Sequence, residues 1–375
     1  MIELPLFDES HRVLHRRLRD IAPRFAPIAA RGEAGEEDDA GRDAIRECAA
    51  LGLCGLLTQG SLRAVCLARE AIAAASGLAD AVFAVQGLGS YPLMLSGNRA
   101  IADRYLPEVA DGRRIAAFAL TERGAGSDAS AIVTRATRDG GDYVLEGTKV
   151  FISNAPIASF FIVFARTSDA AKRAISAFVV DRDTAGVTIA RRQQMMAPHP
   201  IGEVRFSGCR VPAAQRLGEE GDGMRLALGT LDFFRTSVGA AMCGIAARAL
   251  QESIARATTR RQFGSAIADF QLTQAALADM ATELDAARLL VYRAAWAKDQ
   301  GQPRISSESA RAKLFATEAA QRIVDRAVQI HGGEGVERGT VVERLYREVR
   351  AARIYEGTSE IQRLVVARHL LEPRA

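Results

Sequence analysis

The sequence predicts a mainly helical protein with a β-domain in its middle, and three observations lead to that fold class. Helical hydrophobic spacing dominates the first third of the chain. Short β-branched and aromatic runs, separated by turn residues, fill residues 113–212. Long alanine-rich helical patterns follow from residue 221 onward, and such helices pack as a bundle. The expected domains are an N-terminal helical domain (1–114), a middle β-domain (115–215) and a C-terminal helical bundle (216–375).

The first third contains helical patterns interrupted by one polar stretch. Asp8 is placed to cap the first helix. Its apolar residues recur at spacings of four, three and four: Leu14, Leu18, Ile21 and Phe25. Residues 44–53 and 62–78 continue the helical pattern, and a short helix is expected before Tyr105. Because Arg31 to Gly41 is polar and rich in glycine and glutamate, we expect a loop there.

The middle third has the composition of strands joined by turns. Residues 139–142 read Asp-Gly-Gly-Asp, which is typical of a turn. The expected strands are Tyr143–Leu145, Lys149–Ile152, Phe160–Ala165, Ala174–Val180, Val187–Ala190 and Val204–Phe206. Short strands at this spacing indicate a small antiparallel sandwich or barrel.

Three long helices are expected after residue 221: Met224–Ala257, Gln271–Asp299 and Ser306–Ile330. The last of them ends at Gly332-Gly333, which are suited to a helix C-cap. Two shorter helices flank Glu356.

Composition and charge exclude several classes of protein. The net charge of +4 arises from 49 basic and 45 acidic residues mixed along the chain, so nucleic acid is not the favoured partner. The five cysteines form no CxxC pair, which indicates reduced thiols, and no metal site is expected. The longest uncharged stretch, residues 81–98, contains glycine, proline, serine and asparagine, so it is not a membrane span. No signal peptide is visible, and the expected location is the cytoplasm.

Glu356 is the strongest candidate for a catalytic group. It lies between Ile354-Tyr355 and Gly357, and a carboxylate beside an aromatic side chain tends to have a raised pKa, which suits a general base. Gly357 allows the backbone to turn sharply between two helices. The local pattern fits equally well a surface glutamate before a C-cap glycine.

Three further segments could bind a cofactor. Residues 117–128 end in a glycine-rich turn with the hydroxyls of Thr121 and Ser127, although a plain structural turn has the same composition. Phe151 and Ser153 lie two residues apart on one strand face, where they could flank a planar ring or serve the core. Residues 258–264 end a long helix with adjacent arginines, which fit either a pyrophosphate or the helix C-terminus.

These four segments, with Gln329–Gly333 and Leu345–Arg347, follow the order and approximate spacing of one known family. The chain resembles the acyl-CoA dehydrogenases, which are flavoproteins, from about residue 8 to residue 371. The resemblance implies an N-terminal helical domain, a middle β-domain and a C-terminal four-helix bundle. It also implies bound FAD and a homo-oligomer, a tetramer or dimer, with FAD at the subunit interface.

The resemblance also implies a role for each matching residue. Glu356 falls on the position of the catalytic base. The residues implied to bind the cofactor are Phe118, Leu120, Thr121, Ser127, Phe151, Ser153, Arg260, Gln262, Gln329, Gly333, Thr358 and Glu360. The residues implied to lie near the acyl-CoA are Tyr91, Ser127, Asp232, Arg235 and Gly357.

The implied reaction is α,β-dehydrogenation of an acyl-CoA thioester to a 2,3-enoyl-CoA. Glu356 would take the α-proton, flavin N5 would take the β-hydrogen as hydride, and electron-transfer flavoprotein would receive the electrons. The thioester oxygen would be held by the backbone N–H of the base residue and a flavin hydroxyl.

The chain departs from the family pattern at two positions. Phe151 stands where the family usually has tryptophan, near the flavin edge, and this leaves the electron acceptor open. Arg123 stands where the family usually has proline; its positive charge near the entrance could favour an anionic acyl group or the CoA phosphates, or it could simply be exposed to solvent. An acyl-CoA oxidase, a flavin-dependent desulfinase or lyase, and a non-catalytic scaffold that binds CoA esters are alternatives on the same fold. The sequence leaves the acyl group open; Tyr91 suggests a pocket for short, branched or cyclic acyl groups. A di-iron bundle is not expected, because the sequence contains no Glu-x-x-His pair.

Overall fold

The computed structural model describes residues 1–170 and 173–371, so the last four residues of the expected C-terminal domain lie outside it. The chain divides into two compact units. Unit 1 comprises residues 1–26, 61–80 and 235–375, and unit 2 comprises residues 27–60 and 81–234. Three of the four divisions fall within helices, namely α2 (Ala22–Glu33), α6 (Gly77–Leu95) and α8 (Gly223–Thr259), and the fourth lies between Gly60 and Ser61.

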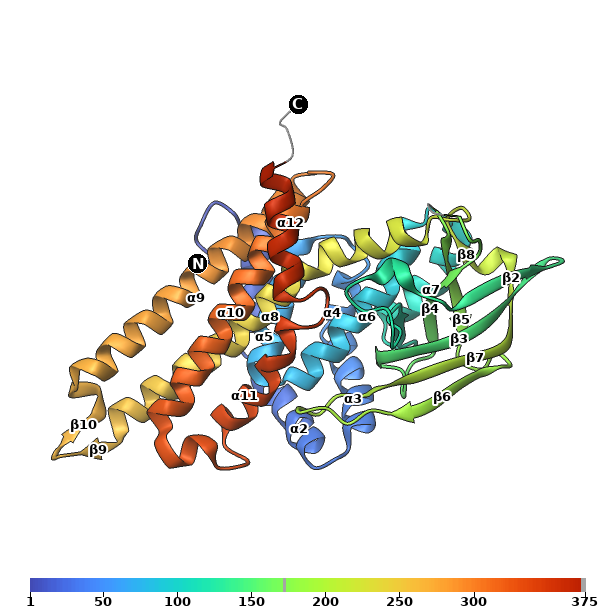
Figure 1. The fold of residues 1–375 in the computed structure, drawn as a ribbon. Helices are drawn as coiled ribbons and strands as arrows, with labels where there is room; N and C mark the ends of the chain where they lie inside the picture. The colour runs from blue at the N-terminus through green and yellow to red at the C-terminus, as the bar shows by residue number, and fades with distance from the viewer. Residues whose placement is uncertain (171–172, 372–375) are drawn as a thin grey trace. The chain divides into compact units, whose positions relative to one another are not determined.

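Unit 1 is built from helices. Its complete helices are α1 (Glu9–Leu18), α5 (Leu62–Ala75), α9 (Gln271–Asp299), α10 (Ser306–His331), α11 (Val341–Arg350) and α12 (Ser359–Leu371). The two long helices α9 and α10 run side by side, and α10 also packs against α11 and α12 (Figure 1). The C-terminal half of α8 joins them, since a Cβ at Gly239 would lie 2.7 Å from Val291 of α9 and 3.4 Å from Ala316 of α10.

Unit 2 combines helices with one eight-stranded sheet. Its complete helices are α3 (Glu37–Ala50), α4 (Leu53–Leu56) and α7 (Arg99–Ala110). The strands are β1 (Ala116–Ala119), β2 (Arg135–Asp139), β3 (Asp142–Ser153), β4 (Phe160–Arg166), β5 (Ile175–Asp181), β6 (Val187–Arg192), β7 (Ile201–Pro212) and β8 (Arg216–Leu217). The strand order is β6-β7-β3-β2-β4-β5-β8, with β1 beside β4 (Figure 1).

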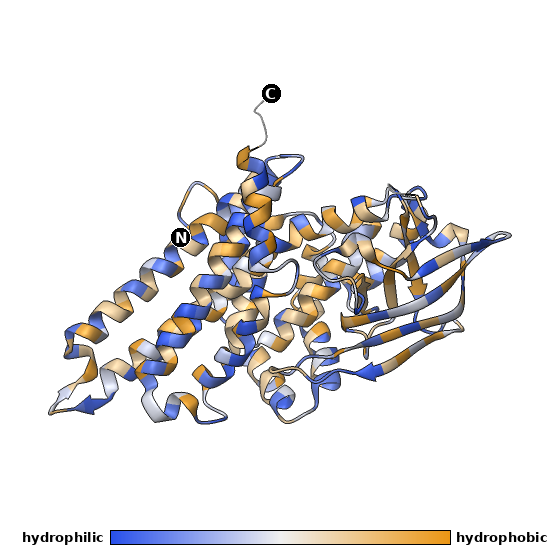
Figure 2. Ribbon diagram, in the orientation of Figure 1, coloured by the Kyte–Doolittle hydropathy of each residue, from blue (hydrophilic) through white to orange (hydrophobic). Residues whose placement is uncertain are grey.

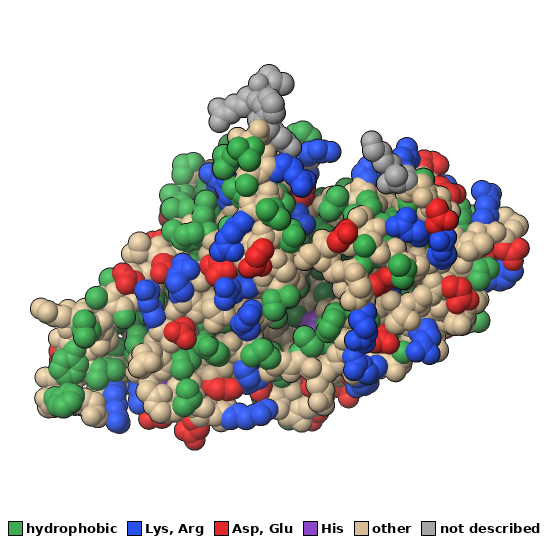
Figure 3. All heavy atoms as spheres, viewed as in Figure 1, with side chains coloured by type: hydrophobic (Ala, Val, Ile, Leu, Met, Phe, Trp, Pro, Cys, Tyr) green, Lys and Arg blue, Asp and Glu red, His purple; other side chains and the backbone are tan. Residues whose placement is uncertain are grey.

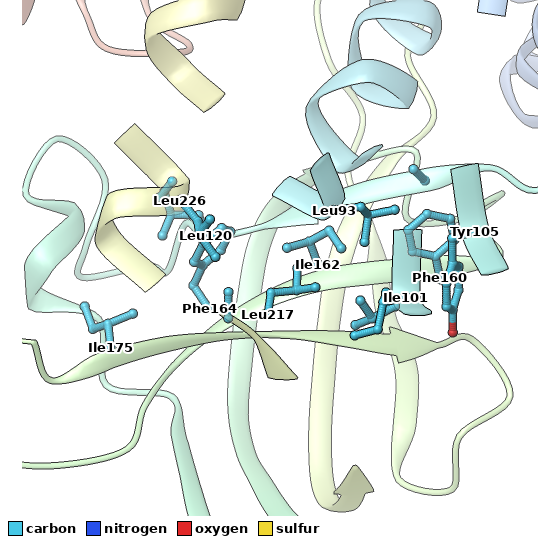
Figure 4. Packing of buried hydrophobic residues seen from close by; sticks show 14 of the residues in the cluster. Leu93, Ile101, Tyr105, Leu120, Phe160, Ile162, Phe164, Ile175, Leu217 and Leu226 are labelled. Atoms are coloured by element: carbon cyan, nitrogen blue, oxygen red, sulfur yellow. The ribbon is translucent and has the colours of Figure 1, made fainter. Parts of the chain in front are cut away.

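The sheet separates two hydrophobic clusters because successive side chains of a strand point to opposite faces. Along β4, Phe160, Ile162 and Phe164 belong to one cluster, and Phe161 and Val163 belong to the other. Figure 4 shows the first cluster, in which Leu93, Ile101 and Tyr105 of the helices pack on the strands. Hydrophilic and hydrophobic residues alternate along the outer strands β6 and β7 (Figure 2).

The expected fold class is confirmed, and the long helices after residue 221 begin and end near the expected residues. Helix α6 was not expected, and α7 continues through Tyr105, although its end was expected before that residue. Helix α9 has the expected bounds, α8 and α10 differ from them by only one or two residues at each end, and Gly332 with a φ of 65° caps α10. Asp8 caps α1 by accepting a hydrogen bond from the His11 amide. The Gly140-Gly141 turn joins β2 to β3, with Asp139 opposite Asp142. The five cysteines are all buried and free.

Several local expectations were wrong. The loop expected over residues 31–41 is mostly helical, because α2 runs to Glu33 and α3 begins at Glu37. The acidic residues there form the first turn of α3, where the helix dipole favours negative charge. The first helix stops at Leu18, since Pro23 is tolerated only in the first turn of a new helix.

The sheet also departs from the expected strands. Tyr143–Leu145 and Lys149–Ile152 are parts of one strand, β3, and its irregular pairing with β7 explains the apparent break. Strand β2 was missed because its sequence, Arg-Ala-Thr-Arg-Asp, has little hydrophobic character. Strands β1 and β2 pair with β4 in parallel, whereas the other pairings are antiparallel.

Helix α6 is the one helix in the described part of the chain that is long and apolar enough to cross a membrane. Of its most apolar window, 83% is buried inside the structure, as in the core helix of a globular protein. Length and composition are therefore weak evidence for a membrane span here. Basic and acidic side chains are interspersed over the face seen in Figure 3, without a continuous basic area.

Candidate active site

Glu356 lies in a tight turn of unit 1 between two helical segments, the short 3-10 helix Ala351–Arg353 and α12. Gly357 has a φ of 90°, as a sharp turn at this glycine requires. Glu356 itself has a φ of 54°, which the sequence did not predict. Five non-glycine residues of the described chain have positive φ, and Phe151 and Glu356 are two of them. Backbone strain of this kind is concentrated at functional sites.

The two carbonyl groups of this turn are held by side chains from three helices. Arg235 of α8 donates from Nε to the Glu356 carbonyl at 3.1 Å. Lys313 of α10 donates from Nζ to the Gly357 carbonyl at 2.6 Å. Gln362 of α12 donates from Nε2 to the Gly357 carbonyl at 2.9 Å. The turn is therefore fixed by contacts from distant parts of the sequence.

The Glu356 carboxylate is shielded from solvent at one oxygen. Its Oε2 atom is buried, and no partner for it is found among the described residues. Burial raises the pKa of Glu356, against the attraction of Arg69, Lys313 and Arg235. The raised pKa was expected from the neighbouring Tyr355, but that side chain is 39% exposed and the cause is burial. The geometry excludes a carboxylate that points into bulk water.

A buried ion pair that the sequence did not reveal lies near Glu356. Arg69 of α5 and Asp80 of α6 form two hydrogen bonds, at 2.9 and 2.8 Å. Arg69 also donates to the Ser237 hydroxyl of α8 at 2.9 Å. The available signal was a single arginine on a helix face otherwise made of alanine and aliphatic residues. This pair places a fixed positive charge in the surroundings of the candidate base.

In unit 2, a buried ion pair supports the glycine-rich segment 117–128. Lys149 donates from Nζ to Glu122 Oε1 at 2.8 Å and to the Leu120 carbonyl at 3.0 Å. Glu122 also accepts from the backbone amides of Val133 and Thr134, at 2.7 and 3.0 Å. These contacts join the loop after β1 to strand β3 and to the loop before β2.

The hydroxyl and aromatic candidates of unit 2 lie beside this ion pair. The Val150 amide donates to the Thr121 carbonyl at 2.9 Å, which brings Thr121 next to β3. Phe151 is 53% exposed, and its amide donates to Gln193 Oε1 at 2.9 Å. Ser153 Oγ lies 2.6 Å from His199 Nε2. Phe151 and Ser153 are outside the core on either side of buried Ile152.

His199 is a site residue that sequence reasoning missed. Burial lowers its pKa to about 4, so the ring is neutral at physiological pH. The segment Pro198-His199-Pro200 offered only a turn signal, and nothing local indicated its contact with Ser153.

Two of the candidates in unit 2 have side chains that pack in the core. Phe118 is half-buried and lies against Phe164, with ring centroids 4.8 Å apart. Leu120 is 7% exposed and belongs to the cluster seen in Figure 4, so chiefly its backbone could face a ligand. Ser127 is exposed, and a Cβ added at Gly124 or Gly126 would meet open space.

The remaining cofactor candidates lie in unit 1. Arg260 and Gln262 are exposed at the end of α8 and in the following hairpin, β9 (Arg261–Gln262) with β10 (Ser265–Ala266). Arg256 forms two hydrogen bonds with Glu334, at 2.8 and 2.9 Å, which bring the end of α8 next to the segment after α10. Gln329 and Gly333, exposed in that region, therefore lie in the same part of the unit.

Thr358 and Glu360 begin helix α12. Thr358 Oγ1 accepts from the Ile361 amide at 3.3 Å. Glu360 is exposed, and backbone and Thr358 hydrogen bonds lower its pKa.

The substrate candidate Tyr91 belongs to an aromatic group in unit 2. Its ring stacks on Phe233 with centroids 4.5 Å apart and meets the edge of Phe234 at 5.9 Å. Gly87 gives the ring of Phe234 room, because a Cβ there would lie 2.4 Å from it. Asp232 is half-buried directly before these phenylalanines. Arg235 is buried and holds the Glu356 turn as described above.

The residues of unit 2 fit the isoalloxazine of FAD. An exposed aromatic side chain, Phe151, lies between the hydroxyl-bearing residues Thr121 and Ser153, and the glycine-rich segment leaves open space beside them. An apolar plate with polar groups at its edge is what a planar heterocycle requires. In that arrangement Phe151 would lie against the ring, and Thr121 and Ser153 would offer hydroxyls to its edge.

Comparison with known proteins agrees with this geometry. Three family profiles match: the acyl-CoA dehydrogenase N-terminal domain at residues 8–113, the middle domain at 117–209 and the C-terminal domain at 221–371. Cyclohexane-1-carbonyl-CoA dehydrogenase of Geobacter metallireducens is 37% identical, over 98% of this chain and 99% of its own. The caffeyl-CoA reductase-Etf complex subunit CarC of Acetobacterium woodii is 36% identical, over 98% and 99%.

A solved structure is similar over nearly the whole of this chain. The glutaryl-CoA dehydrogenase of Mycobacterium smegmatis in complex with FADH2 has a TM-score of 0.88 and 27% identity, over 99% of this chain and 96% of that one. The chain therefore belongs to the acyl-CoA dehydrogenase family, FAD-binding oxidoreductases that act on CoA esters.

Proposed function

We propose that this enzyme removes hydrogens from the α and β carbons of an acyl-CoA thioester and forms a 2,3-enoyl-CoA, with Glu356 as the base for the α-proton. The observation that carries this proposal is the state of the Glu356 carboxylate. It has a buried oxygen without a partner in the described chain, and it is presented by a strained turn that three helices hold in place.

The residues of the turn can supply the two functions that proton removal requires. A desolvated carboxylate is a stronger base than a hydrated one, and burial of Glu356 provides that state. No acceptor for the amide N–H of Glu356 or Gly357 is found within residues 1–170 and 173–371. These amides could donate to the thioester oxygen as the enolate forms, and one such donor typically contributes about 10²–10³ in rate. Bound FAD supplies the acceptor for the β-hydrogen, as hydride at N5.

The other candidate residues would hold the cofactor and the substrate. We infer that Thr121, Ser127, Phe151 and Ser153 contact the flavin. Arg260, Gln262, Gln329, Gly333, Thr358 and Glu360 would bind the rest of FAD. Asp232 and Arg235 would lie near the acyl-CoA. Leu120 would contribute its backbone, because its side chain is packed in the core, and half-buried Phe118 would lie beside it.

The aromatic group of unit 2 supports a substrate with a short, branched or cyclic acyl group. Tyr91, Phe233 and Phe234 fill one another's space by ring stacking, so a long straight chain would have to displace them. A relative is named for a cyclic acyl group, cyclohexane-1-carbonyl-CoA. A higher kcat/KM on a long straight chain than on a four-carbon chain would contradict this preference.

The decisive experiment is a panel of acyl-CoAs mixed anaerobically with the FAD-loaded enzyme and scored by loss of the oxidised flavin absorbance. A member of the panel should bleach the flavin, and Glu356→Gln should slow bleaching by about 10³-fold or more. Glu308→Gln, at a half-buried glutamate of α10, is the matched control and should bleach at the wild-type rate. Bleaching by Glu356→Gln at the wild-type rate would refute the assignment of the base.

Electron-transfer flavoprotein is the acceptor that we propose. A relative is named as part of a reductase-Etf complex, which supports this acceptor. Because that relative is named a reductase, the reverse reaction, reduction of an enoyl-CoA, is a second candidate function for this enzyme. Exposed Phe151 of β3 and exposed Arg123 of the loop after β1, which pairs with Glu203 of β7 at 3.1 Å, are candidates for the acceptor's contact surface. Fast reoxidation of the reduced enzyme by electron-transfer flavoprotein and slow reoxidation by air would support the dehydrogenase; fast reoxidation by air would indicate an oxidase.

We further propose a cytoplasmic homo-oligomer, a tetramer or dimer, with domain boundaries near residues 114 and 215. Light scattering on the purified holoenzyme measures the number of subunits, and a monomer would contradict this proposal.

A further inference from the structure

A buried lysine lies beneath the Glu356 turn. Lys313 has no exposed surface, and it stands on the buried side of α10 among small residues that include Ser309, Ala316 and Thr317. Burial of an ammonium group costs free energy that an apolar side chain of similar length would not cost. The one described hydrogen-bond acceptor of its Nζ is the Gly357 carbonyl at 2.6 Å, a neutral group. A buried charge without a carboxylate directly bonded to it indicates a role beyond packing.

The Lys313 ammonium helps to fix the backbone of the Glu356 turn. Two successive residues, Glu356 and Gly357, have left-handed backbones, which an unrestrained chain seldom adopts. Lys313 and Arg235 are the two charged donors to their carbonyls, and each comes from a different helix. A charge-assisted hydrogen bond is about twice as strong as a neutral one, so the hydrogen bond from Lys313 fixes the Gly357 carbonyl more strongly than the one from Gln362.

The same ammonium also acts on the carboxylate. Charged groups from every helix around Glu356 contribute to its surroundings: Arg69 of α5, Asp80 of α6, Arg235 of α8, Lys313 and Glu318 of α10, and Glu360 of α12. Among them Lys313 lowers the pKa of Glu356, against the effect of burial, and Glu356 in turn raises the pKa of Lys313 against its own burial. Each group therefore favours the charged form of the other.

We propose that Lys313 is a positioning residue for the catalytic base: it holds the Gly357 carbonyl so that the Glu356 turn keeps its left-handed shape, and its positive charge acts on the carboxylate. This inference rests on the proposed function, in which Glu356 removes the α-proton. Lys313 acts through the turn and does not itself contact the substrate.

Two substitutions separate the effect of the hydrogen bond to the Gly357 carbonyl from the effect of the positive charge of Lys313. Lys313→Met removes both the hydrogen bond and the charge, whereas Lys313→Gln removes the charge and keeps an N–H donor on a side chain one bond shorter. Lys298→Met, at a half-buried lysine of α9 with no described partner, is the control for loss of a lysine from the bundle. All variants are compared as FAD-loaded enzymes, with flavin content and thermal unfolding as the measure of folding.

For Lys313→Met we expect kcat for flavin reduction to fall by about 10²-fold, since a small displacement of a catalytic group has that effect. The acid limb of kcat/KM should move up by about one pH unit or more, because an opposite charge nearby favours the ionised carboxylate. Lys313→Gln should show the same pH shift with a smaller loss of kcat. A merely structural lysine would lower thermal stability without moving the pH profile.

An infrared titration supplies a readout independent of turnover. The carboxyl band that is lost in Glu356→Gln belongs to Glu356, and its midpoint should rise in both Lys313 variants. An unchanged midpoint together with kcat within about twofold of wild type overturns the role of Lys313. Should Lys313→Met fail to fold, Lys313→Gln decides by the same two measures. If Glu356→Gln retains full activity, the proposed function fails instead, and the titration still reports whether the two charges interact.

Discussion

The buried pair of Glu122 and Lys149 gives a prediction that can be worked through quantitatively. Lys149 is fully buried and Glu122 is 6% exposed. Lys149 has two acceptors, Glu122 Oε1 and the Leu120 carbonyl, while Glu122 has two further backbone donors. Burial lowers the pKa of Lys149 to about 8, and the attraction of Glu122 opposes that shift. The pair is thus desolvated, and Lys149 Nζ has two acceptors for its three N–H donors.

Replacement of Lys149 by methionine should be costly, and a second substitution should recover part of the cost. Lys149→Met leaves a buried carboxylate without a counter-charge, which costs about 3–5 kcal/mol in unfolding free energy. The two backbone amides still bonded to Glu122 place the expected value near the lower end, about 3 kcal/mol. In Glu122→Gln/Lys149→Met the single amide oxygen can accept from one of the two backbone amides, so we expect a recovery of about 1 kcal/mol.

Equilibrium urea unfolding of the holoenzyme, followed by circular dichroism, measures these differences. Lys298→Met is again the control and should change the unfolding free energy by less than about 0.5 kcal/mol. FAD retention on dilution should weaken in Lys149→Met, because the segment 117–128 loses its anchor on β3. The reasoning is refuted if Lys149→Met costs less than about 1 kcal/mol, or if the double variant is less stable than Lys149→Met alone.

Three other predictions follow from the structure. Gly357→Ala forces an alanine into a backbone with a φ of 90° and puts its Cβ 2.6 Å from Gln362 Nε2. We expect the unfolding free energy to fall by about 1–2 kcal/mol and flavin reduction to slow by about 10²-fold. An unchanged rate of flavin reduction would contradict the role of the turn. The folded protein keeps His199 neutral down to a pH of about 4, whereas the unfolded chain binds the proton near pH 6.5. The unfolding free energy should therefore fall by at most about 3 kcal/mol as the pH drops from 6.5 to 4. His199→Asn should lose this part of the pH dependence of thermal unfolding. Phe161→Ala leaves a cavity at a fully buried position in the sheet and should lower the free energy of urea unfolding by about 3–5 kcal/mol. A measured decrease of less than about 1 kcal/mol would contradict this prediction.

Local patterns predicted the helices well and the sheet less well. Helix α9 carries a helical pattern over its whole length without glycine or proline, so its bounds follow from neighbouring residues alone. Strand β2 has no such local signal; it exists because β3 and β4 offer hydrogen-bonding partners on either side. The pairing of β3 with β7 likewise converts two short apolar runs into one irregular strand. Strand pairing depends on residues far apart in the chain, and a local pattern does not contain it.

In the candidate site, too, some residues could be chosen from local sequence and others could not. Glu356, Gly357 and Thr358 could be chosen from the sequence because a turn between two helices is encoded by adjacent residues. Arg69 and His199 could not, since nothing near them in the sequence indicates which side chain they will meet. Phe118 and Leu120 resembled ligand-binding residues by position, yet their side chains are part of the hydrophobic core.

The sequence by itself determined the order of helical and β segments, the position of the glutamate turn and the resemblance to a flavoprotein family, because each of these depends on neighbouring residues or on motif order. Only the tertiary structure decided the state of the Glu356 carboxylate. Its burial and the three cations around it come from helices α5, α8 and α10. Desolvation and Coulomb interactions depend on distance in space, and folding alone sets that distance for residues so far apart in the chain.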